Sequence, residues 1–389
     1  MRTILSVVMI VTLLLSVVVG AHMYIAQRLV VDLDLVPALR ATLLATIYLL
    51  AASMMLQPVM QRYFQRSTGR WMAWPAFLWA GFAFYLLLGL VVTDLLWSVA
   101  GSAAVATVGQ GGAGLAVARA RAAIVVSVAL LAAAVALRHG LRAPRLQRVT
   151  VRLRRWPRAL DGFRIVQISD LHIGLLLGRT FAEQLVERCN ALAADLLAVT
   201  GDAVDGSVHQ LRDEVAPLAR LSARHGVFFV TGNHDHYSGA NAWALRMQEL
   251  GMRVLRNQRV TIGAHDAAFE LAGVDDLHGD MLGGQGGADV ARALLGADPQ
   301  RAVLLLSHDP GTFPQAAAHG VDLQISGHTH GGQIWPFTYF VRAVTPFVAG
   351  MYRRQDSQLY VSRGTGFWGP PMRLFAPAEI TEITIHHAA

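Results

Sequence analysis

The sequence predicts an α/β domain that follows an N-terminal bundle of about four transmembrane helices. Hydrophobic residues make up 54% of the chain and charged residues only 15%, whereas soluble domains carry about 25% charged residues. Long apolar stretches fill the first 140 residues, and from Phe163 onward short apolar runs alternate with helical patterns. We therefore predict three parts: a transmembrane region at 1–140, a basic linker at 141–160 and an α/β domain at 161–389.

The candidate membrane spans are four apolar segments, at about residues 3–27, 41–61, 71–93 and 117–137. A helix rises 1.5 Å per residue, so about 20 apolar residues cross a hydrocarbon core of about 30 Å. The first three segments reach that length without a charged residue. The fourth reaches it only if Arg119 and Arg121 extend their charged ends toward the interface. The first segment alone resembles a secretion signal, but the three that follow favour an uncleaved helix.

Arginine is concentrated beside the apolar segments and suggests how the chain is oriented. Residues 1–158 hold 16 Arg and 3 acidic residues, whereas residues 159–389 hold 17 Arg and 23 acidic residues. Cytoplasmic loops carry such a basic excess. A chain with four spans then has both ends in the cytoplasm, with its α/β domain on the inner side of the cell (inner) membrane. If the fourth segment does not span, the α/β domain faces outward.

The same distribution limits the partners of the chain. Because the basic residues flank apolar segments instead of lining a folded surface, we expect no nucleic-acid partner. The arginines at 138–158 either contact anionic membrane lipids or act only as a determinant of topology. No feature of the sequence indicates an oligomeric state.

Five short apolar runs in the α/β domain are typical of strands that are buried on both faces of a layered sheet. They are residues 163–168, 196–199, 227–230, 302–306 and 323–325. Between the first two runs, residues 180–194 have a helical pattern. Thr180 is a candidate N-cap of this helix, with Glu183 at the capping-box position.

A cluster of polar residues follows each of the five runs. The candidate ligands in these clusters are, in chain order, Asp170, His172, Asp202, Asn233, His308, His328 and His330. Ligands bind beyond the carboxyl ends of strands in open α/β sheets, so five such strands build one site. Oxygen and nitrogen donors without a thiolate suit Mn²⁺, Fe, Zn²⁺ or Mg²⁺. The sequence therefore predicts a metal centre at this edge.

These clusters, in this order, resemble the signature of the calcineurin-like metallophosphoesterases: Asp-x-His, Gly-Asp, Gly-Asn-His-Asp, a lone His and Gly-His-x-His. The resemblance covers about residues 145–387. GHTHGGQI at 327–334, LYVSRGTG at 359–366, and Arg373 with PAEI at 377–380 resemble the bacterial membrane-associated branch of the family. The resemblance implies a four-layer α/β/β/α sandwich and a hydrolase of phosphate esters that uses two divalent metal ions.

The resemblance also implies a role for each residue of the site. One ion would be held by Asp170, His172, Asp202 and His330, and the other by Asp202, Asn233, His308 and His328. The Asp202 carboxylate would bridge the two ions by offering one oxygen to each. His234 would bind no metal and would lie near the leaving-group oxygen, which it would protonate or stabilise.

Two acidic residues are candidates for supporting roles near His234. Asp235 either orients the His234 imidazole or caps the loop that follows. Asp205 matches a recurrent acid of the family, and we interpret it as a loop-capping or supporting carboxylate, not a ligand.

The substrate is left open by the sequence. The bond cleaved could be a phosphodiester or a pyrophosphate bond, and the substrate could be a lipid-linked molecule or a soluble ester. Aromatic residues at 335–340 and 367–375 either line an acyl-chain groove near the membrane or pack in the core. An alternative function is a membrane sensor or transporter-like module with a phosphoesterase effector domain. The near absence of ionisable residues inside the apolar segments favours a simple anchor.

Overall fold

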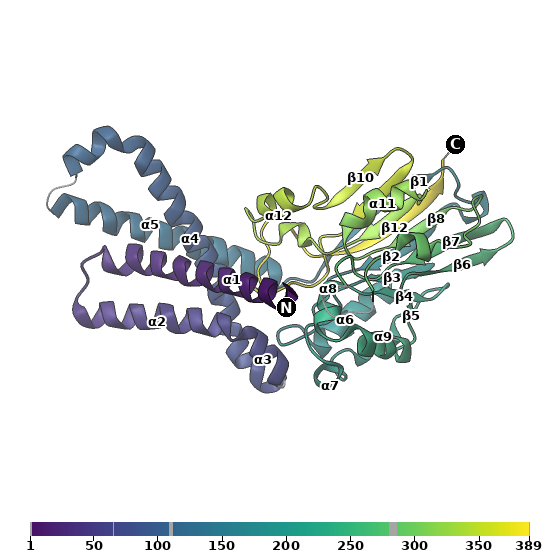
Figure 1. The fold of residues 1–389 in the computed structure, drawn as a ribbon, viewed down its shortest axis with the longest axis horizontal. Coiled ribbons are helices and arrows are strands. Elements are labelled where there is room, and N and C mark those ends of the chain that lie inside the picture. Colours follow the sequence, from purple (N-terminus) through teal and green to yellow (C-terminus); the bar gives the residue numbers. More distant parts are fainter. Residues whose placement is uncertain (1, 65, 109–111, 280–285, 389) are drawn as a thin grey trace. The chain divides into compact units, whose positions relative to one another are not determined.

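The computed structural model describes residues 2–64, 66–108, 112–279 and 286–388, which fall into two compact units (Figure 1). The helical unit comprises residues 1–138 together with 369–372. The sheet unit comprises residues 139–368 together with 373–389.

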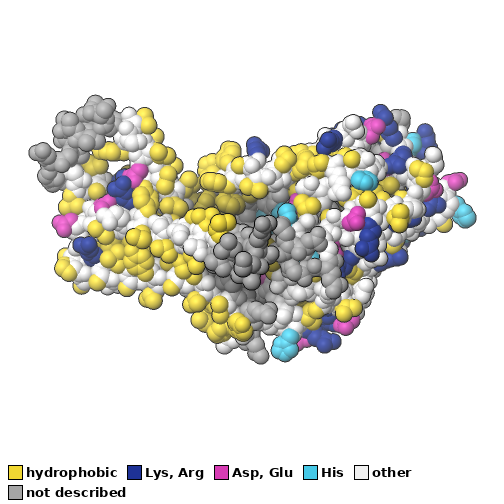
Figure 2. Space-filling view, in the orientation of Figure 1, with side chains coloured by type: hydrophobic (Ala, Val, Ile, Leu, Met, Phe, Trp, Pro, Cys, Tyr) yellow, Lys and Arg dark blue, Asp and Glu magenta, His cyan; other side chains and the backbone are white. Residues whose placement is uncertain are grey.

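The helical unit is built from long apolar helices. Its elements are α1 (Arg2–Ala26), the π-helical turn η1 (Gln27–Val31), α2 (Pro37–Met55), α3 (Gln57–Tyr63), α4 (Arg66–Val108) and α5 (Gly112–Gly140). Within the described residues, three stretches are long and apolar enough to cross a membrane: Pro37–Met55, Thr68–Val99 and Gly114–Gly140. The fourth predicted segment therefore lies in a helix of sufficient length. The first predicted segment, at about residues 3–27, overlaps the shorter apolar helix Leu15–Val31. Figure 2 shows hydrophobic side chains gathered over α1 and α2.

The sheet unit contains two six-stranded sheets. The first has the order β1 (Arg145–Leu153), β12 (Glu379–His387), β2 (Phe163–Ile168), β3 (Leu196–Thr200), β4 (Val227–Val230) and β5 (Arg253–Val254). The second has the order β10 (Gly350–Arg354), β11 (Ser357–Val361), β9 (Leu323–Ser326), β8 (Val303–Leu306), β7 (Ala267–Gly273) and β6 (Gln258–Ala264). Strands β2 to β5 run parallel, as do β7, β8, β9 and β11, so their carboxyl ends share an edge in each sheet.

The two sheets pack face to face, and helices cover their outer faces (Figure 1). Phe228 of the first sheet and Phe269 and Tyr360 of the second belong to the buried core between the sheets. Helices α6 (Arg179–Asn190) and α9 (Ala240–Glu249) pack on the first sheet, and α10 (Val290–Ala293) and α11 (Phe313–Ala318) pack on the second. The predicted α/β/β/α order of layers is confirmed.

The five apolar runs correspond to β2, β3, β4, β8 and β9, but the predicted basic linker at 141–160 is wrong. This stretch contains β1, which pairs in parallel with β12. Val151 and Leu153 of β1 point into the core while the arginines between and around them stay exposed. Arg148 and Arg152 therefore lie on the face of this edge strand opposite to Val151 and Leu153.

The predicted start of the first helix of the sheet unit is also corrected. Gly178 is the N-cap of α6, and Thr180 lies inside the helix. The helix ends at Asn190, since Ala193 adopts a left-handed conformation with φ of 46°.

Candidate metal centre

Five strand ends from both sheets deliver the predicted ligands to one place. Strands β2, β3 and β4 carry the residues of the first three clusters, and β8 and β9 carry those of the last two. The structure brings the side chains of all seven predicted ligands together in two neighbouring groups.

The first group consists of Asp170, His172 and His330, whose donor atoms all lie within 4.8 Å of one another. The Nε2 atoms of His172 and His330 are 3.0 Å apart. Asp170 Oδ1 lies 3.5 Å from His330 Nε2. Asp170 and the two imidazoles are buried.

The second group consists of Asp202, His308 and His328, with donor atoms again within 4.8 Å of one another. His308 Nε2 lies 3.2 Å from His328 Nδ1 and 3.2 Å from the side-chain oxygen of Asn233. Asn233 thus joins this group as an oxygen donor.

Asp202 connects the two groups. Its Oδ2 atom lies 3.2 Å from His308 Nε2 and 3.8 Å from His172 Nε2. Its Oδ1 atom accepts a hydrogen bond from the backbone N–H of His234. Burial alone raises the pKa of Asp202, but the neighbouring imidazoles of His308, His234 and His172 outweigh burial and hold that pKa well below its ordinary value.

The donor set fits divalent cations. Carboxylate, amide and imidazole donors converge on shared points, and this mixture suits the metals that prefer oxygen and nitrogen. The Nδ1 atoms of His172 and His308 contact the Asp205 carboxylate and the Thr200 carbonyl, at 3.0 Å and 2.9 Å. Such contacts hold the proton on Nδ1 and leave Nε2 as the ligand atom.

Backbone strain gathers at the same residues. Positive φ angles, which non-glycine residues rarely adopt, occur at five of the seven predicted ligands: Asp170, His172, Asp202, His328 and His330. Strain of this kind costs about 1–3 kcal/mol per residue and persists mainly where function requires it. The surrounding fold therefore forces these side chains toward the centre.

Arg373 contacts His330 of the first group on the ring nitrogen opposite to the ligand atom. Its guanidinium is fully buried, donates to the carbonyl oxygens of Gly366, Arg363 and Ala376, and lies 3.1 Å from His330 Nδ1. Burial, followed by the charges of His172 and Arg373, holds the pKa of His330 well below its ordinary value. A neutral imidazole is the form that binds a metal.

The contact that orients His234 is made by Asp205, so the first of the two roles considered for Asp235, orientation of this ring, is wrong. His234 Nδ1 lies 2.7 Å from Asp205 Oδ1, the same oxygen that contacts His172. The Asp235 carboxylate instead accepts hydrogen bonds from the backbone N–H groups of Asp202, Ala203 and Gly232. Asp235 therefore positions the loop that carries Asp202. Its own pKa is raised to about 7, first by burial and then by the charge of Asp202.

An exposed aromatic patch includes one ring that lies beside the centre. It consists of Trp335, Phe337, Tyr339, Phe340, Trp368 and Phe375, which are 41–78% exposed. The Trp368 ring lies 5.8 Å from the His234 ring. Core packing, one of the two interpretations of these residues, therefore does not account for them. It does hold for Phe367, which is buried.

The fold and these donors define the class of metal-dependent hydrolases of phosphate esters. Residues 163–332 match the family model of the calcineurin-like phosphoesterases. A bovine transmembrane protein with a metallophosphoesterase domain is 37% identical over an alignment that covers 67% of this chain and 61% of the relative. An uncharacterized metallophosphoesterase of Campylobacter jejuni is 34% identical, with 67% of each chain covered. Another from Bacillus subtilis is 34% identical, over 59% of this chain and 81% of the relative.

The chain belongs to the calcineurin-like metallophosphoesterase family, as its motifs indicate. It spans 61% and 62% of the length of the bovine and zebrafish transmembrane relatives. Members of this family use divalent metals, and the two His/Asp groups are where such ions would bind.

Proposed function

We propose that this chain is a membrane-anchored phosphoesterase that binds two divalent ions and hydrolyses phosphodiester or pyrophosphate bonds. The observation that carries the proposal is the position of Asp202 Oδ2, within 4 Å of a ring nitrogen in each group. Asp170, His172 and His330 would hold one ion, Asn233, His308 and His328 the other, and Asp202 both.

The two ions would supply an activated water and stabilise the charge that develops on the phosphate. The protein itself would manage the proton that the leaving group needs. Burial alone lowers the pKa of His234, but the charges of Asp205 and Asp202 outweigh burial and raise the pKa to about 9. The ring therefore keeps a proton at neutral pH. With Nδ1 held by Asp205, Nε2 offers that proton to the leaving-group oxygen.

The helical unit would anchor the enzyme in the cell (inner) membrane with the sheet unit in the cytoplasm. The arginines that follow α5 support this orientation, and the three long apolar helices support the membrane anchor. We also propose a lipid-linked substrate. The aromatic patch supports it, because Trp, Tyr and Phe rings at the rim of a site provide apolar area for an acyl chain.

The test of the metal proposal is elemental analysis of the full chain purified in mild detergent. Wild-type protein is expected to hold two divalent ions per chain, and Asp202→Asn is expected to lose both. Asp161→Asn serves as the matched control, because that half-exposed carboxylate contacts His386 and the backbone N–H of His387 at the end of β12. An unchanged metal content in Asp202→Asn would contradict the bridging role.

The test of the substrate proposal compares a soluble chromogenic diester with lipid extracts, in the presence of Mn²⁺. Cleavage of a lipid component at a higher kcat/KM than the soluble ester would support the lipid-linked substrate. Purified protein that holds metal but cleaves only the soluble ester would contradict it.

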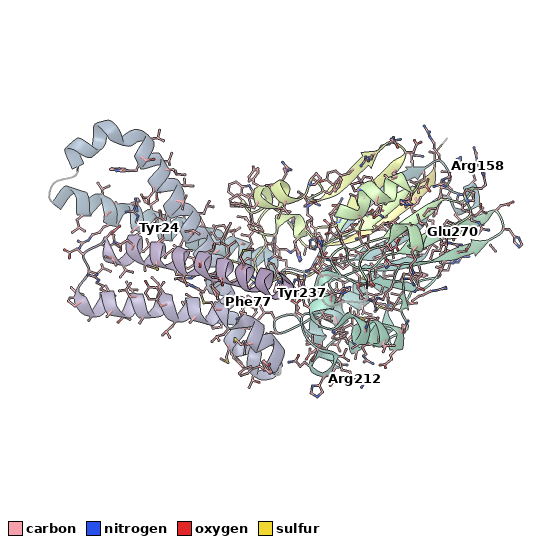
Figure 3. All side chains as sticks on the ribbon, in the orientation of Figure 1. Tyr24, Phe77, Arg158, Arg212, Tyr237 and Glu270 are labelled. Atoms are coloured by element: carbon pink, nitrogen blue, oxygen red, sulfur yellow. The ribbon has the colours of Figure 1, made fainter. Side chains whose placement is uncertain are left out.

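A polar cluster in the helical unit favours a second candidate, the sensor or transporter-like module. Asp94 of α4 forms ion pairs with Arg28 and Arg121 and accepts a hydrogen bond from Tyr24, which Figure 3 labels. Ionisable groups in such segments often mark functional sites. If this cluster regulates the sheet unit, Asp94→Asn changes hydrolysis of a soluble diester by the full chain. An unchanged rate leaves the helical unit as an anchor.

A further inference from the structure

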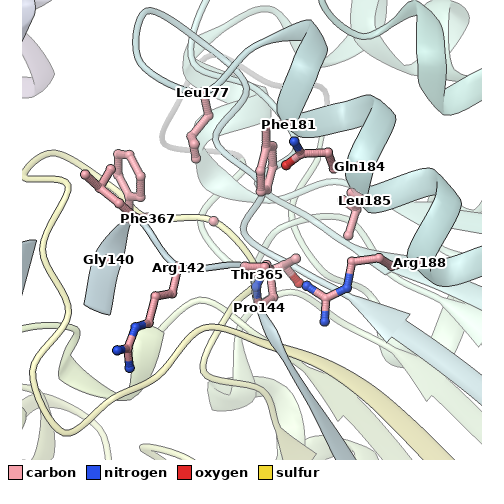
Figure 4. Close-up of a pocket in the computed structure, with 13 residues that line it drawn as sticks. Gly140, Arg142, Pro144, Leu177, Phe181, Gln184, Leu185, Arg188, Thr365 and Phe367 are labelled. Atoms are coloured by element: carbon pink, nitrogen blue, oxygen red, sulfur yellow. The ribbon is translucent and has the colours of Figure 1, made fainter. Parts of the chain in front are cut away.

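A pocket of about 190 Å³ lies in the sheet unit, and none of its lining residues is a predicted metal ligand (Figure 4). Its apolar wall is formed by Leu177, Phe181, Leu185 and Phe367, and Thr365 and Gly366 complete the lining. The charged residues of the lining are Arg142 and Arg188. Among the described residues that line the pocket there is no acidic side chain.

Arg188 is the feature that indicates a ligand. Its guanidinium reaches from α6 toward Thr365 in Figure 4. The Nη1 atom is buried and has no hydrogen-bond partner within the described part of the chain. A buried charged donor without a partner is costly, so an anion that enters this pocket gains a strong charge-assisted hydrogen bond. Arg142 is exposed and adds a second positive charge at the rim.

Part of the pocket lining directly follows a candidate membrane span along the chain. The candidate span Gly114–Gly140 ends at a residue of the lining, and residues 141–144 continue the lining without a break. An extended chain covers at most about 3.6 Å per residue, and the headgroup layer is about 5–8 Å thick on each side of the hydrocarbon core. The residues from Gly140 to Arg142 therefore lie at the level of lipid headgroups when α5 spans the membrane.

We propose that this pocket binds an anionic phospholipid of the surrounding membrane. The phosphate contacts Arg188 and Arg142, and the apolar wall holds the first part of an acyl chain. Occupancy ties the sheet unit to the membrane surface. The proposal is independent of hydrolysis, because none of the metal ligands lines the pocket.

The test is native mass spectrometry of the full chain in mild detergent, titrated with dioleoyl phosphatidylglycerol or dioleoyl phosphatidylcholine. Wild-type protein is expected to prefer phosphatidylglycerol. The double variant Arg142→Gln, Arg188→Gln is expected to bind it about tenfold more weakly, the loss of a charge-assisted hydrogen bond. Its affinity for phosphatidylcholine stays the same.

The matched control is Arg154→Gln, Arg158→Gln, which removes the same charge from exposed positions in the neighbouring basic stretch. It is expected to keep the wild-type preference. A control that loses as much affinity as the pocket variant would overturn the proposal, and so would a pocket variant that loses none. If the double variant does not fold, Arg142→Gln alone at its exposed position gives part of the same loss. Displacement of the lipid by an equal concentration of inorganic phosphate would also refute a lipid site.

Discussion

Asp205 offers the sharpest test of how the centre handles protons, because one of its oxygens contacts two imidazoles. Asp205 Oδ1 lies 2.7 Å from His234 Nδ1 and 3.0 Å from His172 Nδ1. Its charge is the largest of the influences that raise the pKa of His234 from 6.5 to about 9. Asp205→Asn keeps the shape of the side chain and removes that charge.

The expected result follows from the sign of the shift. His234 acts in its protonated form, and without the Asp205 charge it loses its proton at lower pH. The alkaline limb of the kcat profile therefore moves to lower pH by about one pH unit or more. At its optimum, kcat falls by roughly 10–100-fold, the usual effect of removing a carboxylate that orients a catalytic or ligating histidine.

The assay is hydrolysis of a soluble chromogenic diester from pH 5 to 10 at saturating Mn²⁺. Elemental analysis at each end of the range separates a shift of His234 from a loss of metal at His172. Asp161→Asn is the matched control, since its carboxylate is half exposed and contacts His386 and the backbone N–H of His387, neither of which is a predicted ligand. A variant that retains the wild-type alkaline limb would refute the assignment of His234 as the proton donor.

Three further substitutions test other parts of the centre. His234→Ala is expected to keep the metal content and lower turnover by about 100-fold or more; a simultaneous loss of metal would make it a ligand instead. Asp235→Ala leaves three backbone N–H groups without their acceptor, so the free energy of unfolding should fall by about 3 kcal/mol or more. Urea unfolding of the sheet unit measures this fall, and a change below about 1 kcal/mol would contradict the role of Asp235. At Gly327, a Cβ atom would collide with Ser169 Oγ and with the Asp170 carboxylate, so Gly327→Ala should reduce metal content and activity together. The control Gly320→Ala adds backbone strain at a φ of 74° but no collision within 4 Å, so it should lower stability and reduce neither metal content nor activity.

Four of the five strands that the sequence predicted have both faces fully buried. Each of β3, β4, β8 and β9 is buried at every position, which leaves a continuous apolar run that is visible without knowing the fold. The strands that the sequence did not predict include polar residues whose partners lie in other parts of the chain. Glu270 of β7, labelled in Figure 3, is buried only because Arg259 and Arg301 pair with it.

In the site, too, features that depend on neighbouring residues were predicted, and a contact between distant residues was not. The ligand motifs follow strand ends, so the sequence alone predicts that they meet. The choice between Asp205 and Asp235 as the partner of His234 depends on how two loops fold back on each other. Asp235 turns inward to bind backbone N–H groups, while Asp205 reaches the rings from the loop after β3. No pattern of spacing encodes that difference.

The position of β12 between β1 and β2 sets the order in which the protein can be assembled. The register joins Arg145 to Glu379 and Leu153 to His387, so the strand that follows the helical unit cannot pair until residues more than two hundred positions later have been synthesised. Elements made early fold first during synthesis, and pairings between distant segments are slow. The helices thus enter the bilayer while the first sheet is still open, and removing residues 379–387 would take out an interior strand instead of trimming a tail.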